Sequence, residues 1–367
     1  MSHLFKVRRF DYGVAEKLLH SSFIETKYIK MDKKLNILFD GNYLIHRCFS
    51  VWQMYYQDRK LSPEENQQRI AEALIDKEKR QVFMRKVIID FCATVNRFKD
   101  VSKVAMVIDS HSWRYKFYNN YKYAETKFKE DYYSDFCSMI DEIEQFFRSK
   151  GIIVSRVNGA EGDDLLYIWS IYFSQVLEER LVIITGDSDI RQIINNDVSL
   201  FNNNSKILKF YCTAFNEAYW NDYLDPDIIV ESVKPFEILL YKVIMGDTSD
   251  NISKLKKGFG NVAFNKFIDF ITPYEVPDGA SVLDMSQWIA TRFCEFCKNL
   301  NYEDTLGKIL FNVKMTWLNL SVYNDVDITY NGKKLLMNML DDVNSNKNSF
   351  SYNNEYSLEN FYGLPIK

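Results

Sequence analysis

The chain of 367 residues lacks several features that would place it in common protein classes. No run of about eighteen apolar residues is present, which excludes an ordinary transmembrane helix. The first residues, MSHLFKVRRFDYG, lack the apolar segment of a secretory signal. The six cysteines are scattered, and the one CxxC pair, Cys294 and Cys297, has no second pair at zinc spacing. We therefore expect a cytoplasmic protein, in the host cytoplasm if viral, with reduced thiols and no membrane partner.

An excess of charge of one sign is also missing. Lys and Arg number 46 against 50 Asp and Glu, which gives a formal net charge of −4. This weakly acidic total does not exclude a nucleic-acid partner, because the local distribution of charge decides binding. Removing nine metal-binding acids from the sum would leave the rest of the chain at +5.

What the chain does have is a set of acidic segments at the ends of apolar runs or at helix starts. They read LNILFD, VAMVID, EGDD, VIITGDSD and MGDTSDN. A single Asp in such a place is usually a helix cap or a turn residue, but five recurrences argue against that interpretation for the whole set. The nine candidate metal ligands are Asp40, Asp109, Glu161, Asp163, Asp164, Asp187, Asp189, Asp247 and Asp250.

The chemistry of this set indicates divalent cations. The carboxyl ends of parallel strands meet at one crevice, so strands that end in Asp bring carboxylates together. Carboxylates held that closely repel one another and raise each other's pKa. An all-oxygen site suits Mg²⁺ or Mn²⁺.

The periodicity of the chain predicts an α/β fold up to about residue 190. Apolar runs predict strands at Leu35–Phe39, Val104–Ile108, Gly151–Val154 and Leu181–Thr185. Ser62, followed by Pro63 and Glu65, predicts a capped helix start, after which apolar residues recur at helical spacing through Phe98. Strands that alternate with helices predict a central, mostly parallel sheet flanked by helices.

From Pro235 onward the pattern is helical. Pro235 starts PFEILLYKVIM, and Asn261 is predicted to cap the helix that follows the loop LKKGFG. Residues 276–340 read as further helices. The Asn- and Ser-rich residues 341–355 are expected to be flexible.

The acidic segments, in this order, resemble those of the 5′-nuclease superfamily, which includes flap endonucleases and the 5′→3′ exonuclease domain of DNA polymerase I. The similarity is nearest to the RNase H enzymes of T-even phages. It covers residues 34–275 and implies a PIN-like catalytic core with a helical arch at about 111–133 and a helix-three-turn-helix motif at about 236–271. Residues 1–33 would be an N-terminal extension, and residues 276–367 a helical C-terminal region with a flexible tail.

The resemblance also implies roles for individual residues. Two metal ions, Mg²⁺ or Mn²⁺, would be held by the nine acids. Asp40, Asp109, Glu161 and Asp163, assisted by Asp164, match the first metal site. Asp187, Asp189, Asp247 and Asp250 match the acids that complete it and hold the second metal.

Within the arch, Lys122 matches a lysine that reaches the scissile phosphate, and Arg114 matches a basic position before it. The family usually has an Arg where this chain has Glu125, with Lys127 nearby as a substitute. A potassium ion helps the helix-three-turn-helix motif of relatives. The DNA-binding candidates are Lys116, Tyr121, Lys127, Lys254, Lys256, Lys257, Gly258 and Gly260.

We therefore expect a metal-dependent 5′→3′ exonuclease or flap endonuclease that acts as a monomer on flapped DNA or on RNA-primed duplexes. A PIN-like ribonuclease and a DNA-binding protein without catalysis remain alternatives. The C-terminal sequence EYSLENFY is similar to a sliding-clamp-binding peptide, with Leu358, Phe361 and Tyr362 as its apolar contacts, but packing of this tail on its own domain is the favoured interpretation. A single-strand-binding protein is a further expected partner.

Overall fold

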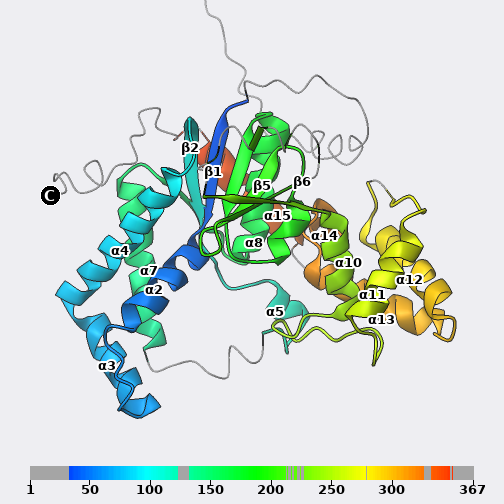
Figure 1. Ribbon diagram of the computed structural model, residues 1–367, viewed down its shortest axis with the longest axis horizontal. Helices are drawn as coiled ribbons and strands as arrows, with labels where there is room; N and C mark the ends of the chain where they lie inside the picture. The colour runs from blue at the N-terminus through cyan, green and yellow to red at the C-terminus, as the bar shows by residue number, and fades with distance from the viewer. Residues whose placement is uncertain are drawn as a thin grey trace, which may run out of the picture. The chain divides into compact units, whose positions relative to one another are not determined.

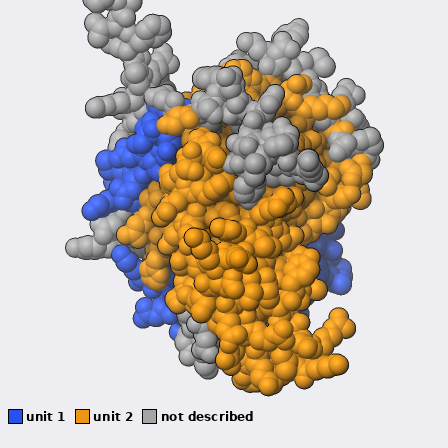
Figure 2. Space-filling model, turned by 90° about the vertical axis from the view of Figure 1, so that its left-hand side faces the viewer, with its two compact units in different colours: residues 1–32, 114–121, 236–348 blue, residues 33–113, 122–235, 349–367 orange. Residues whose placement is uncertain are grey.

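In the computed structural model, the chain divides into two compact units, which Figure 2 colours separately. One comprises residues 33–113, 122–235 and 349–367 and is called the sheet unit here. The other comprises residues 1–32, 114–121 and 236–348 and is called the helical unit. The structure describes residues 33–122, 132–211, 213, 216, 219–220, 224, 227–277, 279–325, 332–347 and 349. Among these residues, no helix is both long and apolar enough to cross a bilayer.

The sheet unit is built on seven strands in the order β3-β2-β1-β4-β5-β6-β7 (Figure 1). The strands β1 to β5 run parallel, β6 is antiparallel to β5, and β7 is parallel to β6. The predicted mostly parallel sheet is therefore confirmed. The strands span Leu35–Asp40, Val101–Val107, Ile153–Ser155, Arg180–Ile184, Val198–Asn202, Ile207–Tyr211 and Ile229–Val233.

The four predicted strands are all present with ends shifted by a few residues, whereas β5, β6 and β7 were not predicted. The central strands are buried on both faces; every residue of β1 is buried, as expected for a parallel strand covered by helices. Leu35, Ile37 and Phe39 belong to one large apolar core with residues of helices α2 (Gly41–Gln53), α4 (Lys77–Val95) and α7 (Tyr133–Ser149). The opposite face of β1 and β2 contacts helix α8 (Gly162–Ile171).

The helices of the sheet unit follow the predicted starts more closely than the predicted ends. The Ser62 capping box is confirmed, with Ser62 and Glu65 each bonding the other's backbone N–H. The predicted continuous helix to Phe98 is wrong. It breaks at Asp76, whose extended backbone and side-chain bonds to the N–H groups of Glu78 and Lys79 start a new helix. The helices are α2 (Gly41–Gln53), α3 (Pro63–Ile75), α4 (Lys77–Val95), α7 (Tyr133–Ser149) and α8 (Gly162–Ile171).

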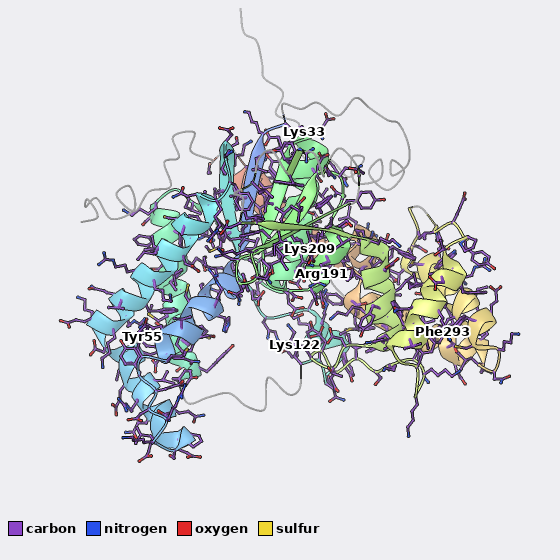
Figure 3. The ribbon with its side chains drawn as sticks, viewed as in Figure 1. Lys33, Tyr55, Lys122, Arg191, Lys209 and Phe293 are labelled. Atoms are coloured by element: carbon purple, nitrogen blue, oxygen red, sulfur yellow. The ribbon has the colours of Figure 1, made fainter. Side chains whose placement is uncertain are left out.

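In its described residues, the helical unit contains a short helix, α5, and the later helices α10 to α15. Phe293 of α12, labelled in Figure 3, packs on Phe259 and Phe267, with ring centroids 5.1 and 5.6 Å apart. The buried Asn312 amide donates to the carbonyls of Val243 and Ser253, at 2.7 and 3.2 Å. The helices span Arg114–Phe117 (α5), Pro235–Met245 (α10), Asn261–Ile271 (α11), Val282–Cys297 (α12), Tyr302–Thr316 (α13), Leu320–Asn324 (α14) and Gly332–Asn346 (α15).

Two expectations for this region need correction. Asn261 does not cap α11: Gly260 is the capping residue, and Asn261 is the first helical residue, whose side chain accepts a hydrogen bond from the Tyr241 hydroxyl at 3.2 Å. Residues 341–355 were expected to be flexible, but α15 continues to Asn346 because Leu336, Met339 and Val343 bury an apolar stripe.

Candidate metal centre and nucleic-acid interface

The order of the strands changes direction at the carboxyl ends of β1 and β4. These strands are neighbours, while the chain passes from β1 to β2 on one side and from β4 to β5 on the other. This reversal of direction is where open α/β sheets bind their ligands. Asp40 ends β1 and Thr185 follows β4, and the Thr185 hydroxyl donates to Oδ2 of Asp40 at 2.8 Å. The N–H of Tyr43 donates to Oδ1 of Asp40 at 2.9 Å, which also starts α2.

Asp109 lies just beyond β2, the other neighbour of β1, and is held at its main chain and its carboxylate. Its N–H donates to Oδ1 of Asn42 at 2.9 Å. Its Oδ1 accepts a hydrogen bond from the N–H of Gly162, the first residue of α8. The start of α8 therefore delivers a backbone donor to Asp109, as helix N-termini do for anions.

The EGDD segment surrounds this helix start. Glu161 precedes α8, and Asp164, which is fully buried, accepts a hydrogen bond from the Glu161 N–H at 3.0 Å. Asp164 thus closes a capping box, which is the structural role that a single Asp in this place would have. Asp163 lies between them and keeps partial exposure.

The carboxylates of the sheet unit influence one another electrostatically. Burial raises the pKa of Asp40 to about 7, and the negative charge of Asp109 adds to the effect. Burial, followed by the charges of Asp187, Glu161, Asp40 and Asp109, raises the pKa of Asp163 well above its usual value. Burial and the Glu161 charge also raise the pKa of Asp109, against the bond from Gly162. The sequence expectation of repelling acids therefore holds for this part of the set.

The loop after β4 carries two further acids. The N–H of Asp187 donates to the Thr185 hydroxyl at 3.0 Å, and Oδ1 of Asp187 accepts from the N–H of Asp189 at 2.8 Å. Gly186 allows close contact with α2, because a Cβ there would lie 2.4 Å from Cε2 of Tyr43. Asp187 is exposed and Asp189 half-exposed.

Lys122 brings a positive charge to the carboxylate cluster. Lys122, labelled in Figure 3, directs its Nζ to Oε1 of Glu161 at 2.8 Å. Its backbone has φ of 47°, a left-handed conformation that costs free energy for a residue with a side chain. Strain of this kind is common where a side chain must be aimed at a site. Lys122 also lowers the pKa of Asp109, although burial outweighs it.

The donor set of the sheet unit fits divalent metal ions. It offers carboxylate oxygens from Asp40, Asp109, Glu161, Asp163 and Asp187, whose repulsion Lys122 relieves only in part, since the pKa of Asp163 stays raised. Hard cations such as Mg²⁺ and Mn²⁺ prefer such ligands. The cluster could therefore hold a metal.

The raised pKa of Asp40 predicts a pH dependence of stability when metal is withheld. Because folded Asp40 has a pKa of about 7 against 3.8, its proton stabilises the fold fully below about pH 4, and this stabilisation is lost as pH rises through 7. In EDTA, Asp40→Asn should make the fall in unfolding free energy between pH 5 and 6.5 shallower by about 1.4 kcal/mol per pH unit. Urea unfolding at several pH values measures this slope; equal slopes for both proteins would contradict the assignment.

The last acidic segment lies in the helical unit. Asp247 is buried and accepts hydrogen bonds from Lys242 Nζ and from the backbone and hydroxyl of Ser249. Burial opposes ionisation, but the bonds from Lys242 and Ser249 outweigh it and lower the pKa of Asp247. Asp247 and Ile252 also exchange backbone hydrogen bonds, at 2.9 and 2.7 Å, which closes the turn that contains Asp250.

Of the segment predicted as an arch, residues 111–122 and 132–133 are described. Arg114 is 4% exposed, and its Nε donates to the Met315 carbonyl at 3.0 Å. Tyr121 is also buried and lies in an apolar cluster with Ile252 and Met315, whereas Lys116 is exposed. Lys127 and Glu125, and the clamp-binding candidates Leu358, Phe361 and Tyr362, lie outside the described residues.

The loop between α10 and α11 is anchored by one aromatic side chain. Phe259 is buried against α12, while Gly258 and Gly260 on either side are exposed, with open space where a Cβ would lie. Gly258 has φ of 78°, which favours glycine. Lys254 and Lys257 are exposed and Lys256 is half-exposed. The loop therefore presents bare backbone and positive charge at the N-terminus of α11, an arrangement suited to phosphate.

Sequence reasoning missed several residues around these sites. Thr185 and Asn42 bond to Asp40 and Asp109, and Arg156 Nε donates to the Asp109 carbonyl at 3.1 Å. Thr185 and Asn42 lie next to acidic segments in the sequence, which could have marked them as candidates. No local signal marks Arg156, because its contact depends on β3 lying beside β2.

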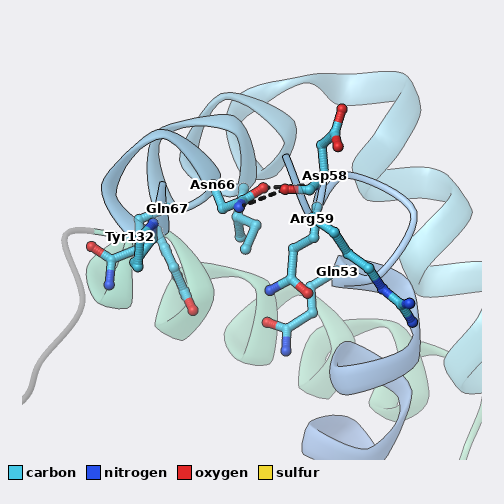
Figure 4. Close-up of a pocket in the computed structure, with 9 residues that line it drawn as sticks. Gln53, Asp58, Arg59, Asn66, Gln67 and Tyr132 are labelled. Carbon is cyan, nitrogen blue, oxygen red and sulfur yellow. Dashed lines mark hydrogen bonds between the residues drawn. The ribbon is translucent and has the colours of Figure 1, made fainter. Parts of the chain in front are cut away.

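A pocket of about 380 Å³ beside the loop that joins α2 to α3 was also missed (Figure 4). Asn66 organises its loop by accepting from the Asp58 N–H at 2.7 Å and donating to the Asp58 carbonyl at 3.0 Å. The lining residues are Gln53, Gln57, Asp58, Arg59, Pro63, Asn66, Gln67, Ile70 and Tyr132.

Sequence comparison identifies relatives of the sheet unit. Residues 35–220 match the model of the family described as 5′-3′ exonuclease, N-terminal resolvase-like domain. A 5′-3′ exonuclease of Mycoplasmopsis pulmonis is 24% identical over 237 residues, which are 62% of this chain and 66% of that protein. A 5′-3′ exonuclease of Buchnera aphidicola is 25% identical over 175 residues, 47% of this chain and 55% of that protein. The matches thus span less than two thirds of either relative.

Solved structures with a similar fold come from phage T5. The T5 5′-exonuclease with bound zinc ions has a TM-score of 0.52 at 14% identity, covering 85% of this chain and 99% of that chain. The T5 flap endonuclease in a pseudo-enzyme-product complex with DNA and metal ions has a TM-score of 0.51, also at 14% identity, covering 85% of this chain and 100% of that chain. At this identity the likeness establishes the fold.

Proposed function

Because the chain belongs to the 5′-3′ exonuclease family, through the N-terminal resolvase-like domain at residues 35–220, we propose that it is a metal-dependent, structure-specific 5′ nuclease. It would hydrolyse phosphodiester bonds of DNA or of RNA primers at junctions between single strand and duplex, during replication or repair. The observation that carries the proposal is the group of mutually repelling carboxylates at the carboxyl ends of β1, β2 and β4. The T5 structure with DNA and metal ions supports the same reading.

Asp40, Asp109, Glu161, Asp163 and Asp187 would hold Mg²⁺ or Mn²⁺ in the sheet unit. On the motif match, Asp187, Asp189, Asp247 and Asp250 would complete the site and hold a second ion, an assignment that rests on sequence alone. When bound, such a pair of ions supplies an activated water and neutralises charge on the phosphate. Asp164 keeps the start of α8 in place through its bond to the Glu161 N–H.

Lys122 would contact the scissile phosphate. It is paired with Glu161, and an ion pair of this kind can exchange its carboxylate partner for a phosphate oxygen when substrate binds. Arg114 would steady the phosphate together with Lys122, although its side chain is buried and its Nε donates to the Met315 carbonyl. Both roles are proposals that rest on the motif match and on these contacts.

The loop 254–260 would bind the phosphate backbone of the duplex. A potassium ion bound at this loop would assist that contact. Exposed lysines and the bare backbone of Gly258 and Gly260 support contacts that do not read base sequence. This loop and its two helices favour a 5′ nuclease over a PIN-like ribonuclease. A sliding clamp or single-strand-binding protein as partner, a monomeric state and a cytoplasmic location are proposals that rest on sequence alone.

Replacing two of these lysines should weaken DNA binding in a salt-dependent way. In Lys254→Gln/Lys257→Gln, each lost phosphate contact lowers the slope of log K against log salt by about 0.9, so the slope should fall by about 2. Fluorescence anisotropy with a flap duplex in EDTA at several KCl concentrations measures it. Lys308→Gln, an exposed lysine of α13, is the control. An unchanged slope would remove the loop from the interface.

The test of the proposed function is cleavage of a 5′-labelled flap duplex and a matched nicked duplex, in Mg²⁺ and in EDTA. Cleavage near the junction in Mg²⁺, abolished by EDTA, is the expected result. Tight binding without cleavage in either Mg²⁺ or Mn²⁺ would favour a binding protein without catalysis. Cleavage of single-stranded RNA with no preference for a junction would favour the PIN-like alternative.

A further inference from the structure

The main chain of Asp109 is gripped from two sides by side chains of other elements. Asn42, the second residue of α2, accepts the Asp109 N–H at 2.9 Å. Arg156, which follows β3, donates from Nε to the Asp109 carbonyl at 3.1 Å. Both peptide groups that flank the Asp109 Cα are thereby fixed, which sets the position of Cα and the direction of the Cα–Cβ bond that carries the carboxylate.

Arg156 is itself fixed by helix α7. Its Nη1 donates to Oδ1 of Asp141 at 2.6 Å and to Oε2 of Glu144 at 3.0 Å. A guanidinium held by two carboxylates keeps a fixed direction for its remaining donors, because the group is planar and rigid. The Nε donor of Arg156 is therefore aimed at Asp109 by residues that lie on a different element.

The small stability contribution expected of these ion pairs indicates that they orient Arg156 rather than stabilise the fold. The Arg156 side chain is 36% exposed and that of Asp141 is 54% exposed, and ion pairs with that exposure add little to stability. Asp109, in contrast, must be held in place against electrostatic repulsion. Glu161 and Asp164 repel its carboxylate, while the N–H of Gly162 holds one oxygen.

We propose that Arg156 and Asn42 are positioning residues that hold Asp109 in the orientation required to bind a divalent metal ion. The inference rests on the proposed metal-dependent function. It adds two residues whose side chains bond to the main-chain N–H and carbonyl of Asp109. Groups that orient metal ligands typically change metal affinity by about 10-fold to 100-fold when removed. The effect should therefore appear in metal affinity before it appears in the maximal rate.

The experiment compares Arg156→Gln with Arg148→Gln. Arg148 is a matched control, since it pairs with the same Glu144, at 2.9 Å, and has a similarly exposed side chain. Mn²⁺ binding to the DNA-free protein, followed by electron paramagnetic resonance, should weaken by about 10-fold in Arg156→Gln and stay unchanged in Arg148→Gln. Asn42→Ala, which removes the other contact, should weaken Mn²⁺ binding in the same direction.

A titration of cleavage with Mg²⁺ separates positioning from simple loss of structure. In Arg156→Gln the half-saturating Mg²⁺ concentration should rise by about 10-fold, and excess Mg²⁺ should restore most of the rate. Wild-type Mn²⁺ affinity in both Arg156→Gln and Asn42→Ala would overturn the inference. So would a rate deficit that Mg²⁺ does not relieve and that Arg148→Gln shares. Failure of the wild-type protein to bind Mn²⁺ would instead overturn the proposed function.

Discussion

Asp163→Asn should lower the rate of flap cleavage in Mg²⁺ by about 10³-fold, equivalent to about 4 kcal/mol of transition-state stabilisation, while DNA binding is retained. Asp163 is the acid whose pKa responds to four neighbouring carboxylates, which places it centrally in the cluster. An amide keeps the size of the side chain but removes the charge that a divalent ion needs. Single-turnover cleavage and anisotropy on the same flap duplex measure the two quantities.

The same substitution should stabilise the protein when metal is withheld. Burial and repulsion raise the pKa of Asp163, so its ionised form destabilises the folded state at pH 8, and the uncharged amide removes that cost. The melting temperature in EDTA at pH 8 should rise by about 2–4 °C for each kcal/mol relieved. At pH 4 the gain should shrink, because Asp163 is then protonated in the folded wild-type protein.

Cleavage in Mg²⁺ and melting temperature in EDTA together distinguish a metal ligand from an acid that supports the fold. Asp269→Asn, an exposed acid of α11, is the control and should change neither cleavage nor melting. A variant that is inactive and also less stable in EDTA would show that Asp163 supports the fold. Normal turnover would remove Asp163 from the metal site altogether.

The sequence predicted the centre of the sheet well because the signal there is local. A strand buried on both faces is a continuous apolar run, and the Asp that ends it is adjacent in sequence, as in β1 with Asp40. The β7 edge of the sheet gave no such signal. Strand β7 exposes most of its residues, so its sequence, IVESV, has no apolar pattern to detect.

Other details depended on backbone geometry or on distant contacts. Apolar periodicity continues across Asp76, so only the capping preference of Asp marked the break between α3 and α4. Whether Gly260 or Asn261 caps α11 was decided by the extended backbone of Gly260. The bond of Thr185 to Asp40 joins residues 145 positions apart, and only the pairing of β1 with β4 brings them together.

Gly162→Ala should inactivate the protein without unfolding it. A methyl group at Gly162 would lie 2.6 Å from Oδ1 of Asp109, closer than real Cβ contacts, and 3.8 Å from Val107, an ordinary contact. The clash therefore falls on the tip of one side chain, which can rotate away, and alanine suits a helix better than glycine. Misplacing a reacting or metal-binding group by about 1 Å can cost about 10²-fold in rate, and cleavage should fall by that order.

Two other glycines test whether the atom that an added methyl group meets decides which property is lost, cleavage or stability. A Cβ at Gly41 would lie 2.6 Å from the backbone oxygen of Val107, the last residue of β2, where the main chain cannot rotate away, so Gly41→Ala should lower the melting temperature as well as the rate. A Cβ at Gly307, within α13, meets nothing within 4 Å, so Gly307→Ala should leave cleavage unchanged. Wild-type cleavage by Gly162→Ala would mean that Asp109 tolerates displacement, and hence that its position contributes little to the reaction. Loss of both folding and cleavage would mean that the helix start, rather than the carboxylate, had moved.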